Sequence, residues 1–159
     1  MEAMSIEIET FQAGFRITPM TTEILTSVVA LEEECGLNSR GIEGYRRMLS
    51  DQRAILLVAI EGDELVIGLF SGNVVVDELQ IDNLAVSDRR WRKGVGRRLL
   101  RSALSLAKSL GAHTATLEVR SSNLPARTLY EKEGFVVAGL RRRYYLTPLD
   151  DALLLSREI

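Results

Sequence analysis

The chain has 159 residues, of which 46% are hydrophobic and 26% charged, a size and composition ordinary for one globular domain with its own core. We therefore expect a single domain over residues 1–159, with residues 1–14 as a loose N-terminal extension. A net charge of −2 and a pI near 5.6 argue against a nucleic-acid-binding protein, which would carry a basic surface.

We expect no targeting or membrane segment. Its start, MEAMSIEIETF, has neither the basic beginning nor the apolar core of a signal peptide, and no apolar run approaches the roughly 18 residues that cross a bilayer. These features predict a cytoplasmic protein without a membrane partner. The single cysteine, Cys35, is expected to be a packed thiol, the lone His113 a surface or packing residue, and no cluster of metal ligands is visible.

Apolar periodicity predicts short strands and helices in the first half of the chain. In chain order these are a strand at 15–17, a helix from a cap at Thr21 or Thr22 to Gly36, a helix at 42–49, and strands at 55–60, 65–70 and 79–86. The Gly62-Asp63 turn signal makes the second and third of these strands a hairpin.

The second half of the chain continues the alternation. It contains an amphipathic helix at 95–110 ended by Gly111, a strand at 114–119, a helix at 125–133 stopped by Gly134, and strands at 135–137 and 152–155. Because strands and helices alternate, the predicted fold class is α/β (α+β), with one central mixed sheet flanked by helices on both faces.

The segment WRKGVGRRLL, residues 91–100, carries the first chemical signal. Two glycines at the mouth of a helix, Gly94 and Gly96, let main-chain N–H groups approach an anion, and the helix directs its positive end at that anion. Basic side chains surround them without an intervening acid. These are Arg89, Arg90, Arg92, Lys93, Arg97, Arg98 and Arg101. The pattern is typical of a pyrophosphate site.

Two better-known phosphate loops do not fit this segment. A nucleoside-triphosphate loop ends in Gly-Lys-Ser/Thr, whereas Gly96 precedes two arginines. A dinucleotide loop needs a small residue three positions after the second glycine, where this chain has Leu99. The remaining alternative is a glycine turn leading into a solvated, arginine-faced helix.

The second signal lies in LEVRSSNLPARTLYEKEGF, residues 117–135. Strand alternation sends Glu118 to the face opposite its apolar neighbours, and an isolated glutamate among strand formers is disfavoured unless it is solvated, paired or used. The alternative for Glu118 is a surface ion pair with Arg120 or Lys132. Tyr130 could equally be a core aromatic, and Asn123 a helix N-cap.

Together the two segments resemble the GNAT superfamily of acetyl-CoA-dependent N-acetyltransferases, and within it the ribosomal-protein alanine N-acetyltransferase (RimI-like) group. The family signature Gln/Arg-x-x-Gly-x-Gly/Ala falls on residues 91–96, after the strand IDNLAV. The group's LEVR, Asn, LYE and GF follow at residues 117–120, 123, 129–131 and 134–135, and RRRYYL resembles its Arg-rich Tyr-Tyr segment.

The resemblance implies roles for particular residues. Glu118 would be the general base that takes a proton from the acceptor ammonium, and Tyr130 the acid that meets the departing CoA thiolate. Main-chain groups of the strand would hold acetyl-CoA beside the glycine turn and Asn123. The implied acetyl-CoA contacts are Leu84, Ala85, Val86, Arg92, Lys93, Gly94, Val95, Gly96, Arg97 and Asn123. Trp91 departs from the signature at a position that contributes mainly through its main chain.

The acceptor stays open at the level of sequence. The favoured acceptor is a protein N-terminus, and the alternatives are a small-molecule amine or a CoA-binding sensor module without catalysis. Residues 141–145, RRRYY, either line an acceptor groove or carry the solvated charges of an edge strand. The chain is expected to act as a monomer or homodimer.

Overall fold

A computed structural model describes residues 14–159, which form one seven-stranded sheet in the order β1-β2-β3-β4-β5-β7-β6. The strands are β1 (Phe15–Pro19), β2 (Ala54–Glu61), β3 (Leu65–Val75), β4 (Glu78–Val86), β5 (Thr114–Arg120), β6 (Val136–Leu146) and β7 (Leu149–Glu158). The pair β4–β5 is parallel and every other neighbouring pair is antiparallel, so the predicted mixed sheet is confirmed.

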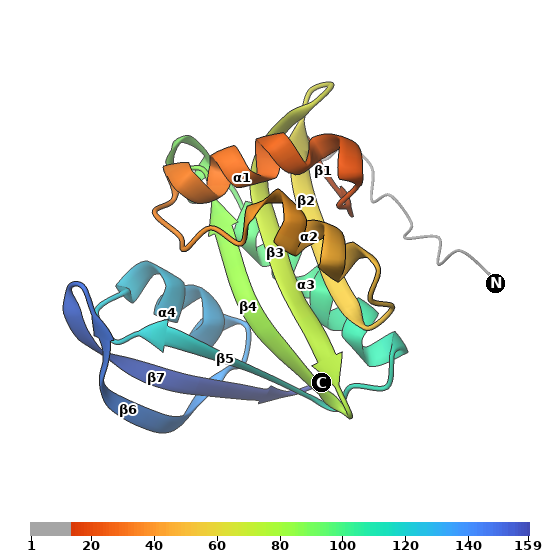
Figure 1. Cartoon of the computed structure of the whole chain (residues 1–159). Helices are drawn as coiled ribbons and strands as arrows, with labels where there is room; N and C mark the ends of the chain where they lie inside the picture. The colour runs from red at the N-terminus through yellow and green to blue at the C-terminus, as the bar shows by residue number, and fades with distance from the viewer. Residues whose placement is uncertain (1–13) are drawn as a thin grey trace.

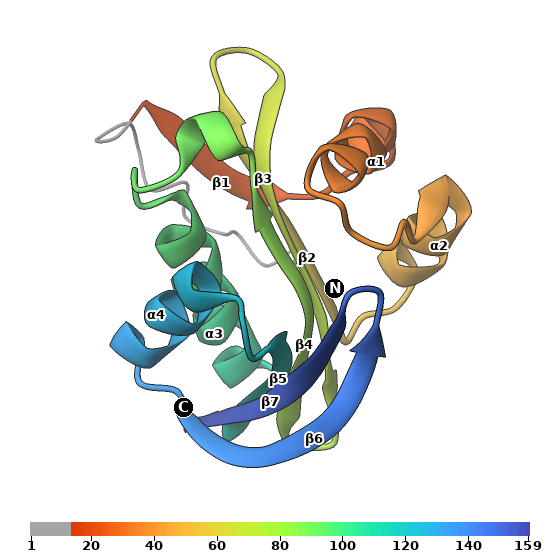
Figure 2. The same ribbon diagram turned by 90° about the vertical axis from the view of Figure 1, so that its left-hand side faces the viewer.

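Within the described residues, four α-helices cover the two faces of the sheet (Figures 1 and 2). They are α1 (Leu25–Glu34), α2 (Gly41–Leu49), α3 (Val95–Ser109) and α4 (Leu124–Lys132), and two 3₁₀ turns, Thr22–Ile24 and Asp88–Arg90, complete the set. Figure 2 shows α1 and α2 on one side of the sheet and α3 and α4 on the other. We call these the α1–α2 face and the α3–α4 face.

Each face has its own buried core. The α3–α4 core joins the buried stripe of α3, which includes Leu99, Leu100 and Ala103, to inward side chains of the central strands. The α1–α2 core packs Val28 and Leu31 of α1 and Tyr45 of α2 on the other face of β2 and β3. Because β4 and β5 are parallel, their connection must cross the sheet, and α3 is that crossover.

A β-bulge interrupts β4 near its middle. Ser71 of β3 pairs with Asn83 of β4, whereas the following residue of β3, Gly72, pairs with Ile81. Asp82 is therefore left as the extra residue. A Cβ at Gly72 would come within 2.7 Å of the Gln80 carbonyl oxygen, a distance that real Cβ atoms do not adopt. The absence of a side chain at Gly72 therefore allows the close approach of β3 and β4 at the bulge.

Several sequence expectations need correction. The last two strands, predicted at 135–137 and 152–155, are much longer and form the edge hairpin β6–β7, because β6 is exposed over most of its length and lacks the alternation that marks a half-buried strand. Thr21 precedes the first 3₁₀ turn without a capping side-chain hydrogen bond. The expected N-terminal extension lies, except for Gly14, outside the described residues.

Candidate active site

The sheet opens between β4 and β5. Their pairing runs from Glu78–Thr114 to Ile81–Leu117 and stops there, although β4 continues to Val86 and β5 to Arg120. Figure 1 shows the two strands diverging toward α4. We call this opening between residues 82–86 and 118–120 the splay. Main-chain groups on its two sides have no strand partner across it, which leaves them available to a reactant.

Glu118 is the first residue of β5 beyond the last pair with β4. Its neighbours Leu117 and Val119 are buried in the α3–α4 core, so its side chain lies on the α1–α2 face, as strand alternation predicts. Tyr130 belongs to the α3–α4 core together with Leu117 and Val119. The predicted base and acid therefore lie on opposite faces of the sheet, on either side of β5.

The Glu118 carboxylate is partly buried, with 28% of its side chain exposed. Its ion-pair partner is Arg141 of β6, at 3.2 Å from Nε to Oε1, rather than Arg120 or Lys132. A side-chain hydrogen bond to Glu118 is the main reason that the pKa of Tyr144 is raised. The edge hairpin thus brings two of the five residues in RRRYY to the glutamate.

Tyr130 is fixed by the way α4 ends. The Phe135 N–H donates to the Tyr130 carbonyl at 2.9 Å and the Gly134 N–H donates to the Glu131 carbonyl at 3.1 Å, with Gly134 at φ +89°. This is a Schellman motif, and its apolar contact is the edge-to-face pair of the Tyr130 and Phe135 rings, 5.5 Å between centroids. Burial raises the pKa of the Tyr130 phenol, so the phenolic oxygen keeps its proton.

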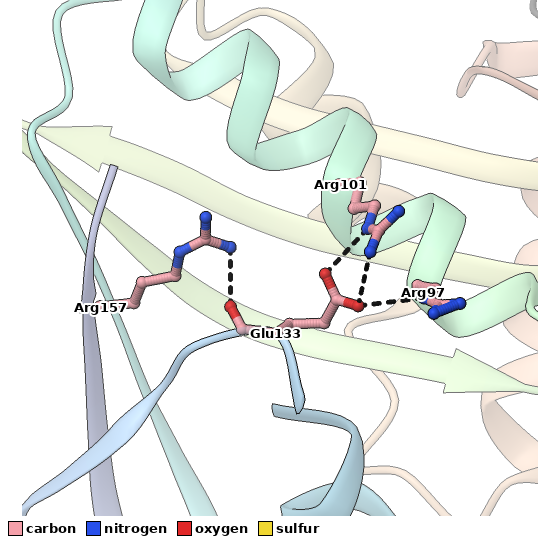
Figure 3. Close-up of polar contacts among 4 residues, drawn as sticks. All are labelled: Arg97, Arg101, Glu133 and Arg157. Atoms are coloured by element: carbon pink, nitrogen blue, oxygen red, sulfur yellow. Dashed lines mark hydrogen bonds and ion pairs between the residues drawn. The ribbon is translucent and has the colours of Figure 1, made fainter. Parts of the chain in front are cut away.

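Glu133, the C-cap of α4, ties that helix to α3 and β7 (Figure 3). Its side chain is only 5% exposed, and its oxygens accept hydrogen bonds from Arg101 Nε at 2.9 Å, Arg101 Nη2 at 3.2 Å and Arg97 Nε at 3.1 Å. Arg157 of β7 donates to the Glu133 carbonyl at 2.7 Å. Hydrogen bonds from Arg101 lower the pKa of Glu133 below its ordinary value, so the carboxylate stays ionised.

The glycine turn enters α3 as predicted, and the two glycines have different tasks. Gly94 is the N-cap in the left-handed region at φ +80°, following Arg92 at φ +61°. Gly96 is tightly packed, because a Cβ there would lie 3.3 Å from Leu129 of α4 and 3.6 Å from Val86 of β4. The first turn of α3, whose N–H groups have no helical acceptor, therefore lies against both α4 and the end of β4.

The end of β4 directs main-chain groups into the splay. Ser87 donates its N–H to Ile67 of β3 at 2.8 Å, so the alternation of an antiparallel pair turns the N–H groups of Leu84 and Val86 away from β3, toward the splay. Trp91 Nε1 donates to the Val86 carbonyl at 2.9 Å. The indole at the unusual position of the signature therefore anchors the turn to β4.

The other predicted acetyl-CoA contacts are divided between two tasks. Arg92 and Lys93 are exposed beside the turn and fit a pyrophosphate, whereas the Arg97 guanidinium is bound to Glu133. The side chains of Val95, the first residue of α3, and Ala85 are buried in the two cores, so only their main chains would be open to acetyl-CoA. The Asn123 side chain accepts from the Ala126 N–H at 3.2 Å and caps α4.

Several other features complete the description of residues 14–159. A cavity of about 320 Å³ between α4 and β6 is lined by Arg127, Glu131, Gly134, Phe135, Val136, Val137 and Leu155. Within residues 14–159, no three His, Cys, Asp or Glu side chains gather as metal ligands would. None of the helices in that range has the length and apolar character to cross a membrane. His113 is exposed, and burial raises the pKa of the Cys35 thiol.

Residues 25–135 match the Acetyltransferase (GNAT) family. The chain belongs to the GNAT family of acetyltransferases. The family match confirms the predicted enzyme class and fold. It also confirms acetyl-CoA, the family's co-substrate, as the source of the acetyl group. The exposed Arg92 and Lys93 beside the free N–H groups of α3 suit the pyrophosphate of that molecule.

Individual relatives of the acetyltransferase are similar in sequence and structure. A ribosomal protein bS18-alanine N-acetyltransferase of Salmonella typhimurium is 36% identical over 106 residues, 65% of this chain and 72% of that one. The protein of the same name from Escherichia coli K12 is 41% identical over 88 residues, 54% of this chain and 60% of the relative. The crystal structure of the Escherichia coli ribosomal-protein-S18-alanine N-acetyltransferase aligns with a TM-score of 0.81 at 27% identity, covering 91% and 94% of the two chains.

Sequence reasoning about the acetyltransferase missed Glu133 as a structural residue. A carboxylate at the C-terminal end of a helix is disfavoured by the helix dipole, and Glu133 follows Glu131 at such an end. That unfavourable placement was the available signal that the side chain has cationic partners elsewhere. Nothing local in the sequence points to Arg141 as the partner of Glu118, because the pairing depends on how β6 curls.

We predict that Glu133→Gln lowers the free energy of unfolding by about 1 to 2 kcal/mol at pH 7, since charge-assisted hydrogen bonds are lost while the half-exposed arginines regain water. The native pKa of Glu133 lies below its ordinary value of 4.5, so the stabilisation is complete above that pH and is lost as pH falls through the native pKa. Urea unfolding of both proteins from pH 7 to pH 3 measures the difference.

Glu131→Gln is the matched control, because it removes the same charge from an exposed position at the same helix end. Its stability should match that of the wild type or slightly exceed it. A Glu133→Gln deficit that stays constant down to pH 3 would contradict the assignment of the effect to the ionised carboxylate.

Proposed function

We propose that this enzyme acetylates the N-terminal α-amine of a protein, of the ribosomal-protein alanine type, by direct transfer from acetyl-CoA, with Glu118 as general base and Tyr130 as acid. The observation that carries the proposal is the splay, with Glu118 on one face of the sheet and Tyr130 on the other. A thioester lying through this opening would meet both residues at once. Relatives named bS18-alanine N-acetyltransferases support the choice of acceptor.

The donor would enter from the α3–α4 face. Its pyrophosphate would bind the Arg92–Gly96 turn at the start of α3, and its pantetheine arm would run along residues 84–86 of β4. The N–H groups of Leu84 and Val86 that point into the splay would polarise the thioester carbonyl and stabilise the charge that develops on its oxygen. This side of the site also holds Tyr130, near the place where the sulfur would leave.

The acceptor would enter from the α1–α2 face, where Glu118 lies. Glu118 would take a proton from the ammonium, through a water molecule, and the free amine would attack the thioester carbon. The carbon–sulfur bond then breaks, the acetyl group stays on the nitrogen, and the electron pair leaves with the sulfur of CoA. Direct transfer requires no acyl-enzyme, and it leaves no role for the two serine hydroxyls that contact carboxylates, Ser87 on Glu34 at 2.8 Å and Ser122 on Asp150.

Tyr130 would act mainly as a hydrogen-bond donor to the leaving sulfur. A phenol of ordinary pKa gives its proton to a thiolate at a cost of roughly 2 kcal/mol, and burial of Tyr130 makes this transfer more unfavourable. A short-range donor in a dry site still stabilises the charge that develops on sulfur, because the helix end and the Phe135 ring already fix the position of the Tyr130 ring. The thiolate can take its final proton from water after release.

The acceptor is tested by the release of CoA thiol from acetyl-CoA. We predict release with a short peptide that begins with a free alanine, and none when the same peptide is blocked at its N-terminus, because the α-amine is the nucleophile. Spermidine serves as the small-amine comparison. Release with spermidine but not with the free peptide would contradict a protein acceptor, and acetyl-CoA binding without release to any of the three would contradict catalysis.

The two side chains should differ in which kinetic constant they change. Tyr130→Phe is predicted to lower kcat about tenfold with little change in acetyl-CoA affinity, since the lost hydrogen bond matters only as charge develops on sulfur.

Glu118→Gln is predicted to lower kcat by about 100-fold or more at pH 7, the usual contribution of a positioned base. Steady-state kinetics and acetyl-CoA titration make the measurement. Full activity in Glu118→Gln would remove the base assignment, and equal losses of turnover and affinity in Tyr130→Phe would remove the acid assignment.

A further inference from the structure

We propose that Asp82 is an acceptor-binding residue, whose carboxylate receives the acceptor's ammonium group beside Glu118 on the α1–α2 face of the splay. The proposal rests on the proposed function, because it names what holds the amine that Glu118 would deprotonate. It adds a second carboxylate with a separate task, which is binding rather than proton transfer.

The sheet register places the two carboxylates opposite each other. Ile81 and Leu117 form the last pair of β4 and β5, so Asp82 and Glu118 are the next residues on the two sides of the splay. Asp82 contacts Arg40 at the start of α2, which puts its side chain on the α1–α2 face, the same face as Glu118. Strand alternation agrees, because the preceding residue, Ile81, is buried in the α3–α4 core.

Asp82 is open to an incoming ligand. Its side chain is 37% exposed, and Arg40 Nη2 binds one carboxylate oxygen, Oδ2, at 3.0 Å. A carboxylate has about four lone-pair sites, so an ammonium can bind while the arginine remains in place. Partial burial raises the pKa of Asp82, and Arg40 opposes that effect. The ion pair thus favours a charged carboxylate that a cationic acceptor can use.

Arg40 is itself held in position by buried groups. Its main-chain N–H donates to Glu32 Oε2 at 3.1 Å, and its guanidinium lies over the Tyr45 ring at 5.9 Å from the centroid. Both Glu32 and Tyr45 are fully buried, and burying a carboxylate is costly unless it has partners. The Arg40 N–H is such a partner for Glu32, and their hydrogen bond fixes the start of α2, the point from which Arg40 reaches Asp82.

The arrangement is symmetrical across the splay. Arg40 reaches Asp82 from α2 on one wall, and Arg141 reaches Glu118 from β6 on the other. Each arginine is partly exposed, and such ion pairs are weak enough for a ligand to share or displace them. While Glu118 takes the proton, Asp82 would keep the acceptor nitrogen at the opening.

The test measures the KM of an alanine-starting peptide for Asp82→Asn. We predict an increase of about tenfold, the loss expected for one charge-assisted hydrogen bond, with kcat within about twofold and the KM of acetyl-CoA unchanged. Asp82→Glu keeps the charge and should give an intermediate KM. Glu78→Gln is the matched control, because Glu78 lies on the same face of β4 but beside Thr116, where the strands are still paired.

Acetyl-CoA binding reports that each variant is folded, and Asp82→Glu alone decides the question should Asp82→Asn fail to bind the donor. An unchanged peptide KM in the folded variants would overturn the proposal. So would a loss of kcat alone, which would place Asp82 in the chemical step, or an equal effect of Glu78→Gln. Failure of the wild-type enzyme to use the free peptide would instead contradict the proposed function itself.

Discussion

The arrangement of the site depends on the point at which β4 and β5 stop pairing. A parallel pair normally continues for as long as both strands extend, because each unmade main-chain hydrogen bond costs free energy. Here the bulge at Asp82 turns β4 away after Ile81, and Gly72 makes room for the turn. In the proposed function, the unpaired main-chain groups of residues 82–86 would bind an extended substrate, as in recognition by an added strand.

The second constraint is that elements from distant parts of the chain must keep a fixed relation around this opening. The first turn of α3 touches both α4 and β4 at Gly96, and Glu133 binds α3 through Arg97 and Arg101. Tyr130 lies one turn before Glu133 on α4, so the contact that fixes the helix end also fixes the predicted acid. The anion-binding turn and Tyr130 therefore belong to one rigid assembly on the α3–α4 face.

Much of this assembly is readable from the sequence because it is local. Strand alternation places Glu118 on the face opposite Leu117. Gly134 predicts the end of α4, and the two glycines of WRKGVG predict the start of α3. The splay and the ion pairs of Glu118 and Glu133 could not be predicted. The ion pairs join residues that are 23 to 36 positions apart in the chain. The splay depends on where two strands stop pairing, which no local pattern indicates. The length of β6 was missed because an exposed edge strand has no hydrophobic period.

The most direct test of the account is a crystal structure of the enzyme with a conjugate in which the sulfur of CoA is joined through an acetyl carbon to the N-terminus of an alanine-starting peptide. The account predicts that the conjugate passes through the splay between β4 and β5. Its sulfur should lie beside Tyr130 on the α3–α4 face, and its peptide nitrogen beside Glu118 on the α1–α2 face. A conjugate bound with the sulfur outside the splay, or with CoA and peptide on the same face of the sheet, would contradict it.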